Sequence, residues 1–294
     1  MLLTVNLMYA INYIVAKGLM PTIIAPNAFI LLRVSGAAVL FWLLYGLNFE
    51  KVERKDMVRL MVCALFGVAI NQLFFFNGLM RTSPLNSSII MTATPIIVFV
   101  LSIIILKEKP TPRKIIGVMI GAIGAITIIV LSSNSAGSGT PLGDLFIFIN
   151  ATSYSLYMVL VKPLMQKYKP LTVITWVFTF GLIYVLCWPL SSFEISQTNF
   201  TTWQNVDFYK VGFVIIGVTF LPYLLTVTAM KVVSPSIASS YIYLQPVLVT
   251  IFIVSLFYFG WLDYSSDLSL AKLFAAILVF VGVYLVSKKQ KKQT

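Results

Sequence analysis

Long apolar runs alternate along this chain with short polar or charged connections. Each run is about 20 residues long, which as a helix is enough to cross the hydrocarbon layer of a bilayer. We expect ten membrane-spanning helices, at about 2–21, 26–46, 58–80, 84–106, 113–131, 143–163, 171–191, 208–230, 235–258 and 269–287. The pattern predicts an all-α polytopic membrane protein without a soluble domain.

One pattern occurs twice. Residues 83–95 read SPLNSSIIMTATP and residues 234–246 read SPSIASSYIYLQP, so each copy starts with Ser-Pro and ends with a second proline. The copies lie 151 residues apart, counted from Ser83 to Ser234. Each copy falls in the fourth of five apolar runs in its half. Five spans per half give the halves opposite orientations, and such inverted repeats are typical of alternating-access transporters.

This repeat divides the chain. We predict a first five-helix repeat at 1–131, an inter-repeat loop at 132–142, a second five-helix repeat at 143–287 and a basic tail at 288–294. The inter-repeat loop is rich in serine and glycine. The longest connection, 192–207, is polar and has no basic residue.

The prolines of the repeat differ in position. Ser-Pro at the start of a run suits a first helical turn, where the missing N–H costs little. Pro95 and Pro246 lie in mid-span and should free the carbonyls of Met91 and Ile242. These kinks either serve packing alone or open a cavity and act in gating. Pro222 predicts a third break, in the eighth span.

Charge predicts the orientation. With the N-terminus in the cytoplasm, cytoplasmic segments hold 16 of the 21 basic residues, and the opposite side holds four. This bias is strong evidence for both termini in the cytoplasm. It places Cys63 and Cys187 near opposite membrane faces, so we expect no disulfide.

Composition narrows the chemistry. The chain is 59% hydrophobic and 10% charged, has a net charge of +12 and contains no histidine. The basic residues lie in short connections, so they indicate topology and not nucleic-acid binding. The nine carboxylates lie in loops or at span ends. We therefore expect no metal site, no cofactor and no enzymatic activity.

Four features together resemble the EamA type of the drug/metabolite transporter superfamily. They are YAINYIVAK (9–17), Arg33 in the second span, the Ser-Pro to Pro spacing, and KEKPTPRKIIGVMIGAIG (107–124). Tyr9 and Ala10 stand where the family often has Trp-Gly, and Phe259 stands where a second residue like Glu108 would fall. The resemblance covers essentially the whole chain. It implies ten helices around a central cavity, with the fifth and tenth helices peripheral.

The implied cavity helices carry polar and aromatic residues in mid-span. We predict that a subset binds substrate: Asn12, Tyr13, Asn71, Gln72, Phe75, Thr94, Tyr154, Tyr157, Tyr223, Tyr241 and Gln245. For the Asn71-Gln72 pair the alternative is an interhelical hydrogen bond that holds the bundle together. Arg33 and Lys17 either contact an anionic group or snorkel and tie backbone carbonyls.

These observations favour a transporter of small metabolites in a bacterial inner membrane. The resemblance implies amino acids or related polar solutes, moved in the export direction. A multidrug or cationic-compound exporter is the alternative within the class. A lipid-modifying membrane enzyme and a non-transporting membrane partner are alternatives from other classes. The expected partners are a small-molecule substrate and lipid, with the peripheral helices as the surface for a homodimer.

Overall fold

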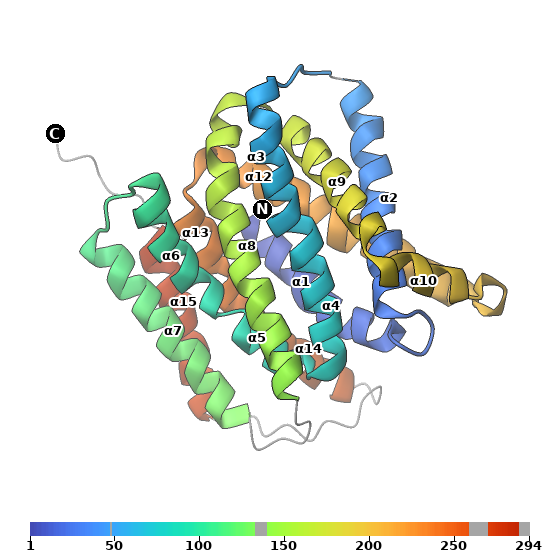
Figure 1. Ribbon diagram of the computed structural model, residues 1–294. Helices are drawn as coiled ribbons and strands as arrows, with labels where there is room; N and C mark the ends of the chain where they lie inside the picture. Colours follow the sequence, from blue (N-terminus) through green and yellow to red (C-terminus); the bar gives the residue numbers. More distant parts are fainter. Residues whose placement is uncertain (48, 133–139, 259–269, 288–294) are drawn as a thin grey trace.

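The computed structural model describes residues 1–47, 49–132, 140–258 and 270–287, and every regular element in these ranges is helical. The helices pack into one bundle (Figure 1). The first half contains α1 (Leu2–Leu19), α2 (Pro26–Gly46), α3 (Arg54–Ala64), η1 (Leu65–Ile70), α4 (Asn71–Arg81), α5 (Pro84–Ile90), α6 (Ala93–Leu106) and α7 (Pro112–Ser132).

The second half follows the same order. It contains α8 (Pro141–Lys167), α9 (Pro170–Cys187), α10 (Pro189–Gln197), η2 (Phe200–Thr202), α11 (Asn205–Phe213), η3 (Val214–Phe220), α12 (Leu221–Val232), α13 (Pro235–Ser240), η4 (Tyr241–Tyr243), α14 (Leu244–Tyr258) and α15 (Leu270–Ser287). Among the described residues, eight stretches are long and apolar enough to span a membrane. The chain is thus a multi-pass membrane protein. The full count of ten spans, which adds α7 and α15, stays a prediction.

Two spans contain a π-helical stretch at matching places. In the first half η1 joins α3 to α4, and in the second half η3 joins α11 to α12. Each stretch directly precedes the polar residues predicted for the substrate site. A π-helical turn is wider than an α-turn, so some of its carbonyls look outward for partners, and such turns are frequent at functional sites.

The repeated Ser-Pro segment forms a broken helix in both halves. The α5 helix ends at Ile90 and α6 starts at Ala93, so Pro95 lies in the first turn of a new helix. In the second copy η4 separates α13 from α14, and Pro246 again lies in a first turn. The helices are therefore interrupted just before Pro95 and Pro246, where kinks were predicted, and a role of these prolines in gating stays a prediction. The Met91 carbonyl accepts from Thr94 N at 3.0 Å, so a tight turn supplies the missing partner.

Other predicted helix ends need correction. The run 171–191 is interrupted, because α9 ends at Cys187 and α10 starts at Pro189. Trp188 has the extended conformation that a following proline favours. The predicted loop 192–207 therefore contains the end of α10 together with η2. Figure 1 shows α10 projecting sideways from the bundle next to α2.

Further differences are smaller. The third span starts four residues earlier than predicted, at Arg54, and α8 continues through Pro163 to Lys167. Pro222 does not separate two helices, because it lies in the first turn of α12 directly after η3. Ser132 ends α7 and Pro141 begins α8; residues 133–139 of the predicted loop, residue 269 and the tail 288–294 lie outside the described residues.

The α7 and α15 helices lie side by side at one edge of the bundle (Figure 1). Gly117, Gly121 and Gly282 form their contact. A Cβ at Gly282 would lie 2.5 Å from the Gly121 backbone nitrogen, so only glycine permits this approach. The small-residue face of α7 is thus used within the chain.

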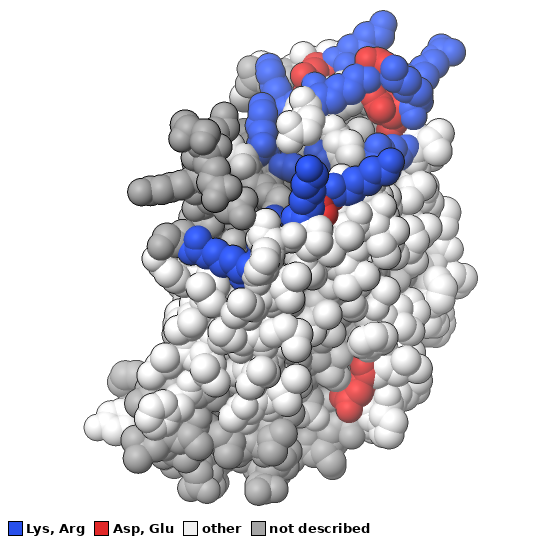
Figure 2. Space-filling model, turned by 90° about the vertical axis from the view of Figure 1, so that its left-hand side faces the viewer, with Lys and Arg blue, Asp and Glu red and all other residues white. Residues whose placement is uncertain are grey.

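Basic side chains gather at one end of the molecule (Figure 2). There the α2–α3 connection binds the α8–α9 turn. Lys167 Nζ lies 2.5 Å from Glu53 Oε1 and 2.6 Å from Asp56 Oδ2, and Tyr168 donates to Asp56 Oδ2 at 2.6 Å. The Lys167 ammonium, followed by that of Lys55, holds the pKa of Glu53 below its usual value. These contacts join the two halves at the basic end.

Candidate functional site

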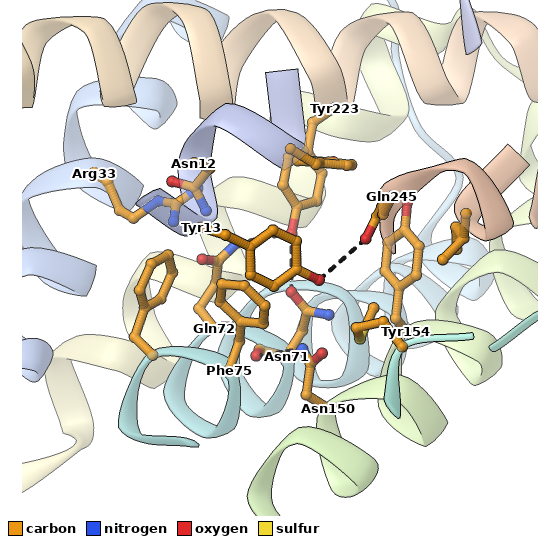
Figure 3. Close-up of a pocket in the computed structure, with 14 residues that line it drawn as sticks. Asn12, Tyr13, Arg33, Asn71, Gln72, Phe75, Asn150, Tyr154, Tyr223 and Gln245 are labelled. Atoms are coloured by element: carbon orange, nitrogen blue, oxygen red, sulfur yellow. Dashed lines mark hydrogen bonds between the residues drawn. The ribbon is translucent and has the colours of Figure 1, made fainter. Parts of the chain in front are cut away.

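A central cavity lies where both halves of the chain meet (Figure 3). It offers about 60 Å³ of space to water-sized molecules, which is room for roughly four waters. Its walls come from α1, α2, α4, α8, α12, the break between α5 and α6, η4 and α14. The lining residues are Tyr9, Asn12, Tyr13, Arg33, Asn71, Gln72, Phe75, Phe76, Met91, Asn150, Tyr154, Tyr223, Ile242 and Gln245.

The π-helical stretch η1 is held from across the cavity. The Tyr223 hydroxyl donates to Gly67 O at 3.0 Å and lies 3.2 Å from Asn71 Oδ1. Gln72 Nε2 donates to the same hydroxyl at 2.7 Å. Ser153 Oγ donates to Phe66 O at 2.6 Å. Side chains from α8 and α12 thus satisfy carbonyls that the wide turn leaves free.

A second chain of hydrogen bonds crosses from α1 to α14. Tyr13 donates its hydroxyl to Gln245 Oε1 at 3.0 Å, as the dashed line in Figure 3 shows. Gln245 Nε2 donates to Asn6 Oδ1 at 2.8 Å. The predicted need of the buried Gln245 amide for a partner is therefore met by protein groups. This arrangement fixes the Tyr13 ring, which meets Phe75 edge-on with centroids 5.3 Å apart.

Arg33 brings a buried positive charge to the cavity. Its side chain is 2% exposed, and its Nε donates to Thr219 Oγ1 at 2.9 Å. Its guanidinium carbon lies 4.5 Å from the centre of the Phe76 ring, a cation–π distance. Within the part of the chain that the structure describes, Nη1 has no hydrogen-bond partner. Among the described residues no carboxylate forms an ion pair with Arg33.

Two amide oxygens in the cavity wall also lack a partner among the residues that the structure describes. They are Oδ1 of Asn12 and Oδ1 of Asn150. Asn150 Nδ2 donates to Asn71 O at 2.7 Å, and this bond determines which end of the amide faces away from η1. The cavity thus offers one cationic donor and two neutral acceptors. Within the described residues no group of three His, Cys, Asp or Glu could hold a metal ion.

The cavity brings together eight of the eleven predicted substrate residues, and Arg33 as well. The eight are Asn12, Tyr13, Asn71, Gln72, Phe75, Tyr154, Tyr223 and Gln245. Substrate binding by these residues remains a prediction, because the geometry gives their placement and not their ligand.

Three predicted residues do not line the cavity. Thr94 is fully buried in the first turn of α6, and no described residue is a hydrogen-bond partner of its hydroxyl. The Tyr157 ring packs on Gly67, where no side chain separates it from η1. Tyr241 packs against the separate apolar cluster that contains Ala122 and Tyr243. Thr94 and Tyr241 lie at the helix breaks, which direct them toward other neighbours, whereas Tyr157 lies on the unbroken α8 and faces η1.

Lys17 also does not line the cavity. Its ammonium donates to Leu79 O at 2.7 Å and to Met80 O and Thr82 O at 3.0 Å. These carbonyls belong to the end of α4 and the turn after it. The structure therefore agrees with the backbone-tie interpretation of Lys17 and not with an anion contact.

Some cavity residues were not among those predicted to bind substrate. They are Tyr9, Phe76, Met91, Asn150 and Ile242. Met91 and Ile242 each lie four residues before a mid-span proline, and they are 151 residues apart. Gln72 and Tyr223 are also 151 residues apart. The repeat spacing was thus a signal that could have identified Met91 and Ile242. Nothing in the sequence distinguishes Phe76 from other buried phenylalanines.

Comparison with known proteins shows the family to which the chain belongs. The model of the EamA-like transporter family matches residues 1–130 and again 141–288. The chain is 26% identical to the "uncharacterized transporter YyaM" of Bacillus subtilis, covering 86% of this chain and 81% of that protein. An "uncharacterized transporter" of Archaeoglobus fulgidus is 26% identical over 91% of this chain and 90% of its own length.

The chain is also similar to more distant proteins. The "WAT1-related protein At5g13670" of Arabidopsis thaliana is 22% identical, covering 96% of this chain and 81% of that protein. A crystal structure with 17% identity superposes with a TM-score of 0.72 and covers 97% of this chain and 94% of its own, which shows the shared fold. Because the family model matches nearly the whole length, the chain belongs to the EamA-like transporter family, within the drug/metabolite transporter superfamily.

Proposed function

We propose that this transporter carries amino acids or related small polar solutes outward through the central cavity. The observation that carries the proposal is the buried polar cavity between the two halves. Its lining includes amides, phenolic hydroxyls and one guanidinium. Uncompensated polar groups at this depth are costly, and a polar solute would supply their missing partners.

The proposed mechanism is alternating access. Its support is the matched placement of irregular backbone in both halves: the π-helical stretches η1 and η3, and the breaks before Pro95 and Pro246. Interrupted helices at the midplane are a recurring feature of transporters built from inverted repeats. In this proposal the broken helices are the elements that move.

A cationic-compound exporter is the alternative, and the aromatic lining is compatible with flat cations. The charge in the cavity favours polar or anionic solutes over cations, because Arg33 lies in the wall and none of the lining residues is acidic. We place the protein in a bacterial inner membrane with both termini in the cytoplasm. An enzymatic role has less support, since the named relatives are transporters.

The test is a thermal-shift screen of the purified protein in detergent against amino acids, nucleosides, polyamines and cationic drugs. A ligand that binds the folded state raises Tm with concentration. We expect a saturable shift from the amino-acid class, lost in Gln72→Ala and Tyr154→Ala and retained in Ser196→Ala on α10. Counterflow in liposomes then checks that the same solute is carried. A shift caused only by cationic drugs would overturn the proposed solute class.

A further inference from the structure

We infer that Arg33 receives the carboxylate of the transported solute. The inference rests on the proposed function and deepens it, because it assigns one end of the solute to one residue. It also states which solutes are excluded: those in which the carboxylate is replaced by a neutral amide.

The guanidinium of Arg33 is held by a hydrogen bond at one edge and by aromatic rings packed against it. Thr219 Oγ1 accepts from Nε at 2.9 Å and itself donates to Val214 O at 2.8 Å within η3. The guanidinium plane is packed by Phe76 at 4.5 Å and by Phe29 at 6.0 Å. These contacts orient the fork and leave Nη1 without a partner. Figure 3 shows the side chain extending toward Asn12 at the cavity.

No described residue balances the charge of Arg33. An arginine keeps its charge even when buried. The described acidic side chains lie in connections or near helix ends, as in Glu53 and Asp56 at the basic end and Glu194 on α10. A buried cation without a counter-ion is costly, whereas a carboxylate arriving with the solute would neutralise it and could occupy the fork.

The rest of the cavity suits the other end of such a solute. The partnerless oxygen of Asn150, which lies away from Arg33 in Figure 3, is a hydrogen-bond acceptor and can receive N–H or O–H groups. The Tyr13 and Phe75 rings provide an apolar wall between polar groups. The inferred solute therefore carries a carboxylate at one end and a hydrogen-bond donor at the other.

A purely structural arginine predicts something different. A tie between α2 and η3 needs only the bond to Thr219 and the packing on Phe76. Loss of such a tie would lower the stability of the empty protein without changing its choice among ligands. The two roles are therefore separated by ligand discrimination and not by Tm of the empty protein.

The experiment uses matched ligands on the full-length protein in detergent. The probes are L-alanine, L-threonine, L-leucine and L-phenylalanine, each compared with its carboxamide, plus L-lactate as a carboxylate without an amine. Affinity is obtained from the concentration dependence of Tm. For the wild type we expect each carboxamide to bind about ten- to a hundredfold more weakly than its acid, as loss of a charge-assisted hydrogen bond predicts.

Two variants assign the effect to Arg33. Arg33→Gln should bring each acid down to the affinity of its carboxamide. Arg33→Lys, which keeps the charge but not the fork, should retain part of the preference. Ser196→Ala on α10, remote from the cavity, should retain all of it. An unchanged preference for the acid in folded Arg33→Gln would overturn the inference.

The wild type alone also tests it. If the carboxamides bind as tightly as the acids, Arg33 does not receive the carboxylate, although the proposed transport of polar solutes stands. If neither acids nor carboxamides shift Tm, the proposed solute class fails and the inference fails with it. Arg33→Gln that does not fold leaves this wild-type comparison decisive.

Discussion

Gly67 lies in η1 against the fully buried ring of Tyr157. A Cβ at this position would lie 2.6 Å from Cγ and 2.9 Å from Cε2 of that ring. The ring cannot retreat easily because it is enclosed on all sides. We predict that Gly67→Ala lowers the free energy of unfolding by about 1–3 kcal/mol, the usual cost of overpacking. Thermal melting in detergent measures it.

The matched control is Gly212→Ala in α11, where an added Cβ would meet nothing within 4 Å. There alanine should be neutral or stabilise the helix by up to about 1 kcal/mol, because glycine is a poor helix former. Equal melting temperatures for the two variants would show that the contact between Gly67 and Tyr157 is not tight.

Two lysines hold helix ends at repeat-related positions. Lys17 of α1 binds the carbonyls at the end of α4, and Lys162 of α8 donates to Met230 O at 2.5 Å and Val233 O at 2.7 Å after α12. Leu79 and Met230 lie 151 residues apart, as do Thr82 and Val233. Terminal carbonyls have no partner within their own helix, and in a bilayer they need one.

We therefore predict that Lys17→Met and Lys162→Met each lower the free energy of unfolding by about 1.5–3 kcal/mol, the range for a hydrogen bond to a charged group. Methionine keeps the apolar stem and removes the ammonium. The exposed Lys231→Met is the control and should change Tm little. A Lys17→Met protein as stable as Lys231→Met would mean that water satisfies these carbonyls.

The α10 helix provides a carboxylate that caps the start of α2. Glu194 accepts from Asn27 N at 2.6 Å, from Asn27 Nδ2 at 2.6 Å and from Ala28 N at 3.3 Å. A carboxylate there pairs with the first amides of α2 and with the positive end of its dipole. We predict that Glu194→Ala lowers the free energy of unfolding by about 1 kcal/mol. The same change should speed hydrogen exchange at the Asn27 and Ala28 amides. Unchanged exchange at both amides would contradict this cap.

At the scale of the whole molecule, the regular features could be predicted from the sequence. Apolar length gave the helices, and the Ser-Pro to Pro spacing located both broken spans. Mid-span amides such as Gln72 pointed to the cavity because polar groups in lipid need partners.

Two kinds of feature could not be predicted from the sequence. They depend on how each helix is rotated about its axis and on contacts with residues far away in the chain. The helix breaks determine that Met91 faces the cavity while Thr94 does not. Lys17 binds carbonyls 62 to 65 residues away, which local sequence does not encode. The α10 helix was missed because its polar residues resemble a loop.

The orientation of the helices in the membrane can be tested at two loops. We expect the basic end in the cytoplasm, so residue 109 and residue 196 should lie on opposite sides, with α7, α8 and α9 crossing between them. In a Cys63→Ser, Cys187→Ser background, Ser196→Cys should react with an impermeant maleimide on intact cells. Lys109→Cys should react only after permeabilisation. The reverse pattern would invert the protein in the membrane. Labelling of both from outside would mean that an even number of spans separates them, so that α7, α8 and α9 do not all cross.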